Sequence, residues 1–127
     1  MKNDFFLSLR LRKKEGDLSC LANTLGLNIK RIWSNGDSLP KNRTADYSYC
    51  VCEIEENDNF DLGQTIENIA ATLAKKRDDI EDFSNSGGHL SLFISLDSNG
   101  FSGTTLDSSQ LKLLGDLRVS LEINRLN

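Results

Sequence analysis

The strongest constraint on this chain is the alternation of apolar and polar residues in several short segments. In residues 89–96, every second residue is Leu or Ile, and residues 4–13 and 119–124 alternate in the same way. A period of two is typical of a β-strand with one face buried and the other exposed. Parallel sheets are usually covered on both faces, so this pattern favours an antiparallel sheet with one open face.

Apolar residues at helical spacing predict three amphipathic helices that cover the buried face of this sheet. The first follows Asp17 and ends at Gly26, and the third runs from Asp107 to Gly115. The second is the longest. It begins at Asp61, ends near Ser84, and is expected to extend about 33 Å as one continuous helix.

The expected fold is therefore α+β, with an antiparallel sheet and three helices packed on one face. The remaining strands are predicted at 29–34, 47–55 and 101–105, the last after a hairpin turn at Asn99-Gly100. This order resembles a ferredoxin-like split β-α-β unit with an added hairpin and helix. No linker or repeat interrupts the pattern, so residues 1–127 are expected to form a single domain.

The charge balance limits the classes of partner. Lys and Arg number 15 and Asp and Glu number 19, which gives a net charge of −4 at pH 7. This balance disfavours binding to nucleic acids and to anionic membranes, and it suits a basic protein partner. The first ten residues lack the apolar core of a secretory signal, and no apolar run is long enough for a membrane span. We expect a cytoplasmic protein with three free thiols.

Short motifs give the chain a resemblance to a known family. Leu25-Gly26-Leu27, Trp33 and Gly36-Asp37 occur in that order, and Gly88-His89-Leu90 leads into a strand in the C-terminal third. This arrangement resembles the bacterial domain of unknown function 4279 family over nearly the whole chain. That family typically has Trp where Tyr47 and Tyr49 stand here. The resemblance implies a shared fold, and it implies no catalytic residues because the family name records no activity.

The residues with catalytic or metal-binding chemistry do not form a recognisable set. His89 is the only histidine, and no activated-serine motif accompanies it. Cys50 and Cys52 share a strand face, but the chain supplies too few ligands at zinc-binding spacing, so both are expected to fill the core. We therefore predict a protein that is not an enzyme and has no metal and no cofactor.

The face of the sheet opposite the leucines is the first candidate binding surface. Strand parity predicts that it carries Phe6, Arg10, Arg12, Tyr47, Tyr49, Val51, His89, Phe93 and Glu122. Aromatic residues and Arg on one exposed face are enriched at protein interfaces. Alternatively, residues 34–46 or a second subunit could cover this face.

Two further features are candidates for binding. Trp33, next to the turn at Asp37, is either a binding hot spot or a plug of the core, and the core reading is favoured because a buried Trp dominates a small core. Four carboxylates lie near the expected C-terminus of the longest helix, where the helix dipole disfavours them. They are Asp78, Asp79, Glu81 and Asp82. They form either a solvated surface or a site for a basic partner.

These observations leave two classes of function open. The first is a protein-binding module, of which an immunity-type protein that neutralises a basic toxin is the specific form, since charge complementarity would speed that encounter. The alternative is a small-ligand-binding or regulatory domain that uses the open sheet face and the Trp33 loop. A homodimer is compatible with either class.

Overall fold

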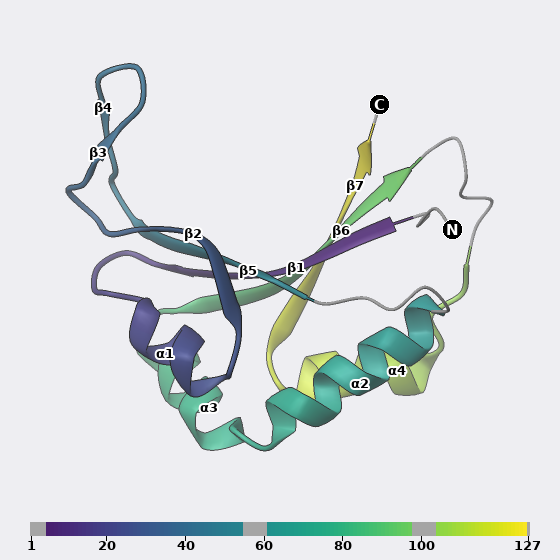
Figure 1. The fold of residues 1–127 in the computed structure, drawn as a ribbon. Coiled ribbons are helices and arrows are strands. Elements are labelled where there is room, and N and C mark those ends of the chain that lie inside the picture. Colours follow the sequence, from purple (N-terminus) through teal and green to yellow (C-terminus); the bar gives the residue numbers. More distant parts are fainter. Residues whose placement is uncertain (1–4, 55–60, 98–103, 127) are drawn as a thin grey trace.

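The computed structural model describes residues 5–54, 61–97 and 104–126 of the 127-residue chain. Within these residues it contains a five-stranded sheet, a two-stranded hairpin and four helices (Figure 1). The elements in chain order are β1 (Phe5–Lys13), α1 (Ser19–Thr24), β2 (Asn28–Trp33), β3 (Ser38–Leu39), β4 (Arg43–Thr44), β5 (Ser48–Glu53), α2 (Leu62–Ala74), α3 (Arg77–Asn85), β6 (His89–Asp97), α4 (Ser108–Asp116) and β7 (Val119–Leu126).

The strand order in the main sheet is β2-β5-β1-β6-β7, with β1 at its centre. β1 is antiparallel to both of its neighbours, so that Leu9 lies opposite Cys52 on one side and Leu92 on the other. The expectation of an antiparallel sheet is thus right for β2, β5, β1 and β6. It is wrong for β7, which is parallel to β6. The connection through α4 returns the chain to the end of the sheet where β6 begins, and such a crossover produces parallel pairing.

The predicted hairpin after β6 has no counterpart among the described residues. Residues 104–107 are not in a strand, although a strand was predicted at 101–105. The predicted turn at Asn99-Gly100 lies outside the described residues. The hairpin that the described residues contain is β3–β4, within the segment predicted to be a loop.

The longest predicted helix is in fact two helices, α2 and α3, which meet at Lys75 and Lys76. The helical backbone is interrupted at Lys76, with φ −120° and ψ 34°. The charges on both sides of the break favour it. Cations beyond the end of α2 and the acidic residues Asp78 and Asp79 in the first turn of α3 each match the helix dipole.

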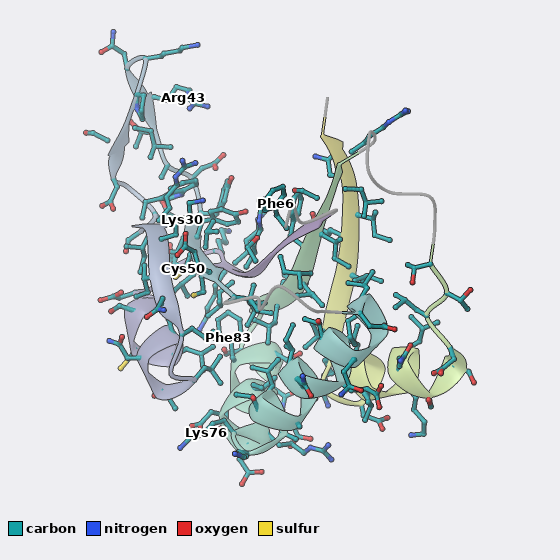
Figure 2. All side chains as sticks on the ribbon, turned by 45° about the vertical axis from the view of Figure 1, so that its right-hand side comes forward. Phe6, Lys30, Arg43, Cys50, Lys76 and Phe83 are labelled. Atoms are coloured by element: carbon teal, nitrogen blue, oxygen red, sulfur yellow. The ribbon has the colours of Figure 1, made fainter. Side chains whose placement is uncertain are left out.

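The core lies between the sheet and the helices, which occupy one side of the sheet in Figure 1. The predicted core residues from the strands are buried as expected, and Leu121 is partly buried. The buried set is Leu7, Leu9, Leu90, Leu92 and Ile94. From α2, Leu73 is buried and Ile69 packs against the cluster. Figure 2 shows Phe83 on the helix side of the sheet and Phe6 on the opposite side.

Acidic side chains cap α2 and α4, whereas the N-cap of α1 is Leu18, after Asp17, and has no side-chain cap. The Asp61 side chain accepts hydrogen bonds from the backbone N–H groups of Gly63 and Gln64, and Asp107 forms a reciprocal capping box with Gln110. Gly26, with φ +71°, follows the first helix in the left-handed conformation that glycine favours. In the described part of the chain, none of the helices has both the length and the apolar character needed to cross a membrane.

Candidate functional site

The side of the sheet that faces away from the helices carries the candidate site. We call it the open face and define it by the described side chains of one strand parity. They include Phe6, Ser8, Arg10, Arg12, Arg31, Trp33, Tyr49, Val51, Glu53, His89, Ser91, Phe93, Ser95, Ser120 and Glu122, and Tyr47 just before β5 belongs to the same surface. All nine residues predicted for this face lie on it. Trp33 was predicted as a separate candidate and not as part of this face, but it belongs to the same surface.

Two arginines on β1 organise the aromatic residues of the open face. The Arg10 guanidinium carbon lies 3.6 Å from the centroid of the Phe93 ring, and Arg10 Nη1 donates a hydrogen bond to Tyr49 Oη at 2.9 Å. The Arg12 guanidinium carbon lies 4.2 Å from the centroid of the Tyr47 ring. These are cation–π distances, so the rings and the guanidinium groups hold one another in place across three strands.

Trp33 completes this group, which contradicts its assignment as a core plug. It lies opposite Tyr49 in the β2–β5 pairing, with the two ring centroids 4.9 Å apart. The Tyr47 ring centroid is 6.0 Å from each of the other two. Trp33 is half-buried, and its Nε1 is a buried donor without a hydrogen-bond partner among the described residues. We call Arg10, Arg12, Trp33, Tyr47, Tyr49 and Phe93 the aromatic–arginine cluster.

The segment after Trp33 is held by a turn at Asp37. Its carboxylate accepts a hydrogen bond from Ser34 N at 2.8 Å, and its own N–H donates to Ser34 O at 3.0 Å. Gly36 adopts φ +96°, which this turn requires. Asp37 therefore positions the β3–β4 hairpin. Figures 1 and 2 show this hairpin projecting beyond the sheet, with Arg43 near its far end. Residues 34–46 thus leave the open face accessible.

The open face contains two hollows on either side of Arg10. The larger has a volume of about 840 Å³, and its lining includes Arg12, Tyr47, Tyr49 and His89. The smaller, of about 440 Å³, is lined by Phe6, Val51 and Phe93 among others. The larger hollow has more charged side chains in its lining than the smaller one, whose charged residues are Arg10, Lys30 and Glu53.

The charge in the larger hollow is opposite in sign to that of the whole chain. Four cationic side chains line it, against the two carboxylates of Asp46 and Glu122. The cations are Arg10, Arg12, Lys13 and Lys14. Among the described residues, neither carboxylate forms an ion pair with any of these cations. The hollow is therefore a locally positive region on a protein with a net charge of −4.

The acidic cluster lies on α3, in the helix layer rather than on the open face (Figure 1). Asp78 and Asp79 occupy the first turn of this helix, where the dipole favours negative charge. The expectation that these carboxylates crowd a helix C-terminus was wrong for Asp78 and Asp79 because the long helix is divided, whereas Asp82 lies in the second half of α3. Asp78, Asp79 and Asp82 are exposed and Glu81 is half-exposed.

The cysteines of β5 belong to the core, as their strand parity predicted. Cys50 and Cys52 are fully buried, and their sulfur atoms are 3.7 Å apart. Burial raises the pKa of Cys50 and raises that of Cys52 to about 12, so both thiols hold their protons at neutral pH. A protonated thiol is a weak nucleophile and a weak metal ligand. His89 lies on the opposite face, where it is exposed.

The fold and the open face define a class of α+β domain whose sheet is covered by helices on one side and offers an aromatic surface on the other. The chain matches the family described as "Domain of unknown function (DUF4279)" over residues 3–126, and it belongs to that family. The comparisons with curated proteins and with solved structures gave no significant match.

Proposed function

We propose that this chain is a non-enzymatic protein-binding module that docks its partner on the open face. The aromatic–arginine cluster carries this proposal. Tyr, Trp and Arg are the residues most enriched among binding hot spots. Here they are locked together by the ring and guanidinium contacts of Arg10, Tyr49 and Phe93, so little side-chain freedom remains to be lost on binding.

The open face is a better candidate than the acidic cluster. The first-turn position of Asp78 and Asp79 gives these carboxylates a structural role in α3, which accounts for them without a partner. The aromatic–arginine cluster has no comparable role in the core, because it lies on the side of the sheet away from the helices. Aromatic side chains gathered on a face away from the core usually indicate contact with another molecule.

An immunity-type role is the narrower form of this proposal, in which the bound partner is a toxin. The net charge of −4 supports long-range attraction of a basic toxin. The cations around the larger hollow favour the opposite charge in the part of the partner that contacts it. We include a cytoplasmic location in the proposal, since the two buried thiols are compatible with a reducing compartment.

A small-ligand-binding or regulatory domain is the second candidate. The observation in its favour is the larger hollow, whose volume of about 840 Å³ lies within the range of small-molecule sites. Tyr47 and Tyr49 line it and offer ring surfaces to a ligand. A ligand of low molecular mass that co-purifies with the chain, with no protein bound, would favour this candidate.

We also infer a ferredoxin-like arrangement for the part of the fold that carries the site. The support is the strand order. β1 and β2 are both antiparallel to β5, which lies between them, and β5 and β6 are both antiparallel to β1. β1 is joined to β2 through α1, and β5 is joined to β6 through α2 and α3, as in two interlocked split β-α-β units. α4 and β7 then extend the sheet at one edge.

The proposal is tested by comparing matched double variants of the immobilised full chain in lysate of the source organism. Tyr49→Ala with Phe93→Ala removes two rings from the open face. Leu111→Ala with Leu113→Ala removes two exposed side chains from α4 as a control. We expect a protein bound by the wild type to be lost from the first variant and retained by the second. Equal capture by both variants, each verified as folded, would contradict the proposal.

A further inference from the structure

We infer that the partner segment that occupies the larger hollow is acidic, with carboxylates that meet Arg12 and Lys14 beside an aromatic or apolar side chain that meets Tyr47. This inference rests on the proposed function and adds the chemistry of the partner. It reverses the expectation from net charge, which points to a basic partner. The observation that supports this inference is that cations and aromatic rings surround the same hollow.

The two arginines of β1 differ in how much of their hydrogen-bonding capacity is already used. Arg10 donates to Tyr49 Oη at 2.9 Å, lies 3.4 Å from Ser8 Oγ through Nε, and stacks on Phe93. Its role is to hold the cluster together. The Arg12 side chain lies over the Tyr47 ring and makes no hydrogen bond or ion pair within the described part of the chain.

The geometry of Arg12 suits a carboxylate ligand. A guanidinium group carries its five N–H donors in its own plane and at its edge. The Arg12 guanidinium lies over the Tyr47 ring, and no hydrogen bond or ion pair within the described residues uses its N–H donors. An edge of this kind binds a carboxylate through two parallel hydrogen bonds, which is among the strongest contacts an arginine makes. Arg12 is exposed, so a partner can reach it.

Lys13 and Lys14 extend the positive region at the end of β1. Both line the hollow together with Arg12, and Lys14 is exposed. Their charges are not neutralised by Asp46 or Glu122, which line the same hollow without forming ion pairs among the described residues. A basic segment in this hollow would face like charges at short range, whereas an acidic segment would pair with them.

The molecule as a whole favours a protein segment over a nucleic acid as the anionic occupant. A nucleic acid presents a continuous row of phosphates, and its affinity grows with the number of phosphates that the protein neutralises. The four cations that line this hollow all lie within residues 10–14, on a chain with a net charge of −4. A short acidic segment matches a localised site, and the rest of a long polyanion would be repelled.

The first experiment identifies the preferred chemistry without knowledge of the natural partner. A library of random peptides is selected on the immobilised full chain, with counter-selection on the folded Tyr49→Ala, Phe93→Ala variant. We expect the retained peptides to combine Asp or Glu with an aromatic residue. Retained peptides that depend on the open face but are basic or uncharged would overturn the acidic partner while supporting the proposed function. If no retained peptide depends on the open face, the proposed function itself fails.

The second experiment measures the charge dependence of a retained peptide. Trp33 is the only tryptophan in the chain and lies in the cluster, so its fluorescence reports binding. Arg12→Glu with Lys14→Glu should weaken binding by at least about tenfold, as is typical when charges that contact a partner are reversed. Lys75→Glu with Lys76→Glu changes the net charge equally at the α2–α3 junction, and we expect binding to be nearly unchanged.

The same variants distinguish an acidic segment from other possible occupants of the larger hollow. Equal weakening by the two double variants would mean that only net charge matters, which overturns the site. Tighter binding of a single-stranded oligonucleotide than of any retained peptide, with loss in the Arg12→Glu, Lys14→Glu variant, would replace the acidic segment with a nucleic acid. A dimer of the chain alone that this variant dissociates would make a second copy the occupant.

Discussion

At the scale of single residues, Trp33 shows how one backbone irregularity decides which side of a sheet a side chain faces. Ile29 pairs with Cys52 on the core side of the sheet, and strict alternation from Ile29 would place Trp33 on that side too. The β2–β5 register shifts between Ile29 and Arg31, so the parity changes and Trp33 lies opposite Tyr49 on the open face. Bulges of this kind leave no clear signal in residues 29–34, so the sequence could not predict this orientation.

The three cysteines provide a residue-scale prediction. Cys20 is exposed, whereas Cys50 and Cys52 are fully buried with raised pKa values. Since a thiol reagent attacks the accessible thiolate, we expect one thiol of the native protein to react rapidly and the other two only on unfolding. A Cys20→Ser variant is the control and should lack the rapid phase. Rapid reaction of all three thiols in the native wild type would contradict the structure.

At the scale of elements, the division between α2 and α3 places Asp78 and Asp79 at a helix N-terminus instead of near a C-terminus. The spacing of Leu73 and Ile80 is compatible with a continuous helix, and the apolar pattern alone therefore could not reveal the break. The signal was in the charges, where Lys75-Lys76-Arg77 is followed by Asp78-Asp79. Lys75 at the end of α2 and Asp78 and Asp79 in the first turn of α3 match the two dipoles, whereas Arg77, the first residue of α3, does not.

This division predicts that the acids of α3 contribute to stability according to their position. Asp78→Lys and Asp79→Lys should each lower the free energy of unfolding by about 0.3–1 kcal/mol, because each places a cation at the positive end of the helix. Asp82→Lys, in the second half of the same helix, is the control and should cause no loss. The measurement is urea-induced unfolding at low ionic strength. Equal effects at all three positions would contradict a helix that begins at Arg77.

At the scale of the whole molecule, the alternating segments allowed the sheet and its buried face to be predicted from sequence. The strands at the centre were the most predictable, because Leu9 and Leu92 belong to long alternating runs. The direction of β7 was not predictable in this way, since alternation carries no information about which way a strand runs. The local positive charge of the larger hollow could not be predicted from the net charge of −4, because that total counts all surfaces of the molecule together.

The core provides a prediction at this scale. Leu92 is fully buried between β1 and β7 in the sheet and faces the helix layer. Leu92→Ala should therefore lower the free energy of unfolding by about 2–5 kcal/mol, through the lost transfer energy and the cavity left behind. Leu111→Ala removes the same atoms from a side chain that is 47% exposed, and its effect should stay within about 0.5 kcal/mol. Denaturant unfolding monitored by circular dichroism measures both.

The central position of β1 has a consequence for how the protein reaches its native state during synthesis. β1 is made before the other strands, yet it pairs with β5 and β6, whose residues are made much later, as Leu9 with Cys52 and Leu92 shows. The middle of the sheet cannot close until β6 has left the ribosome. Pairings between residues so distant in sequence are slow to form, because a long loop must be ordered first. Until then the leucine-rich side of β1 is exposed, and the nascent chain depends on chaperones or rapid collapse to avoid aggregation.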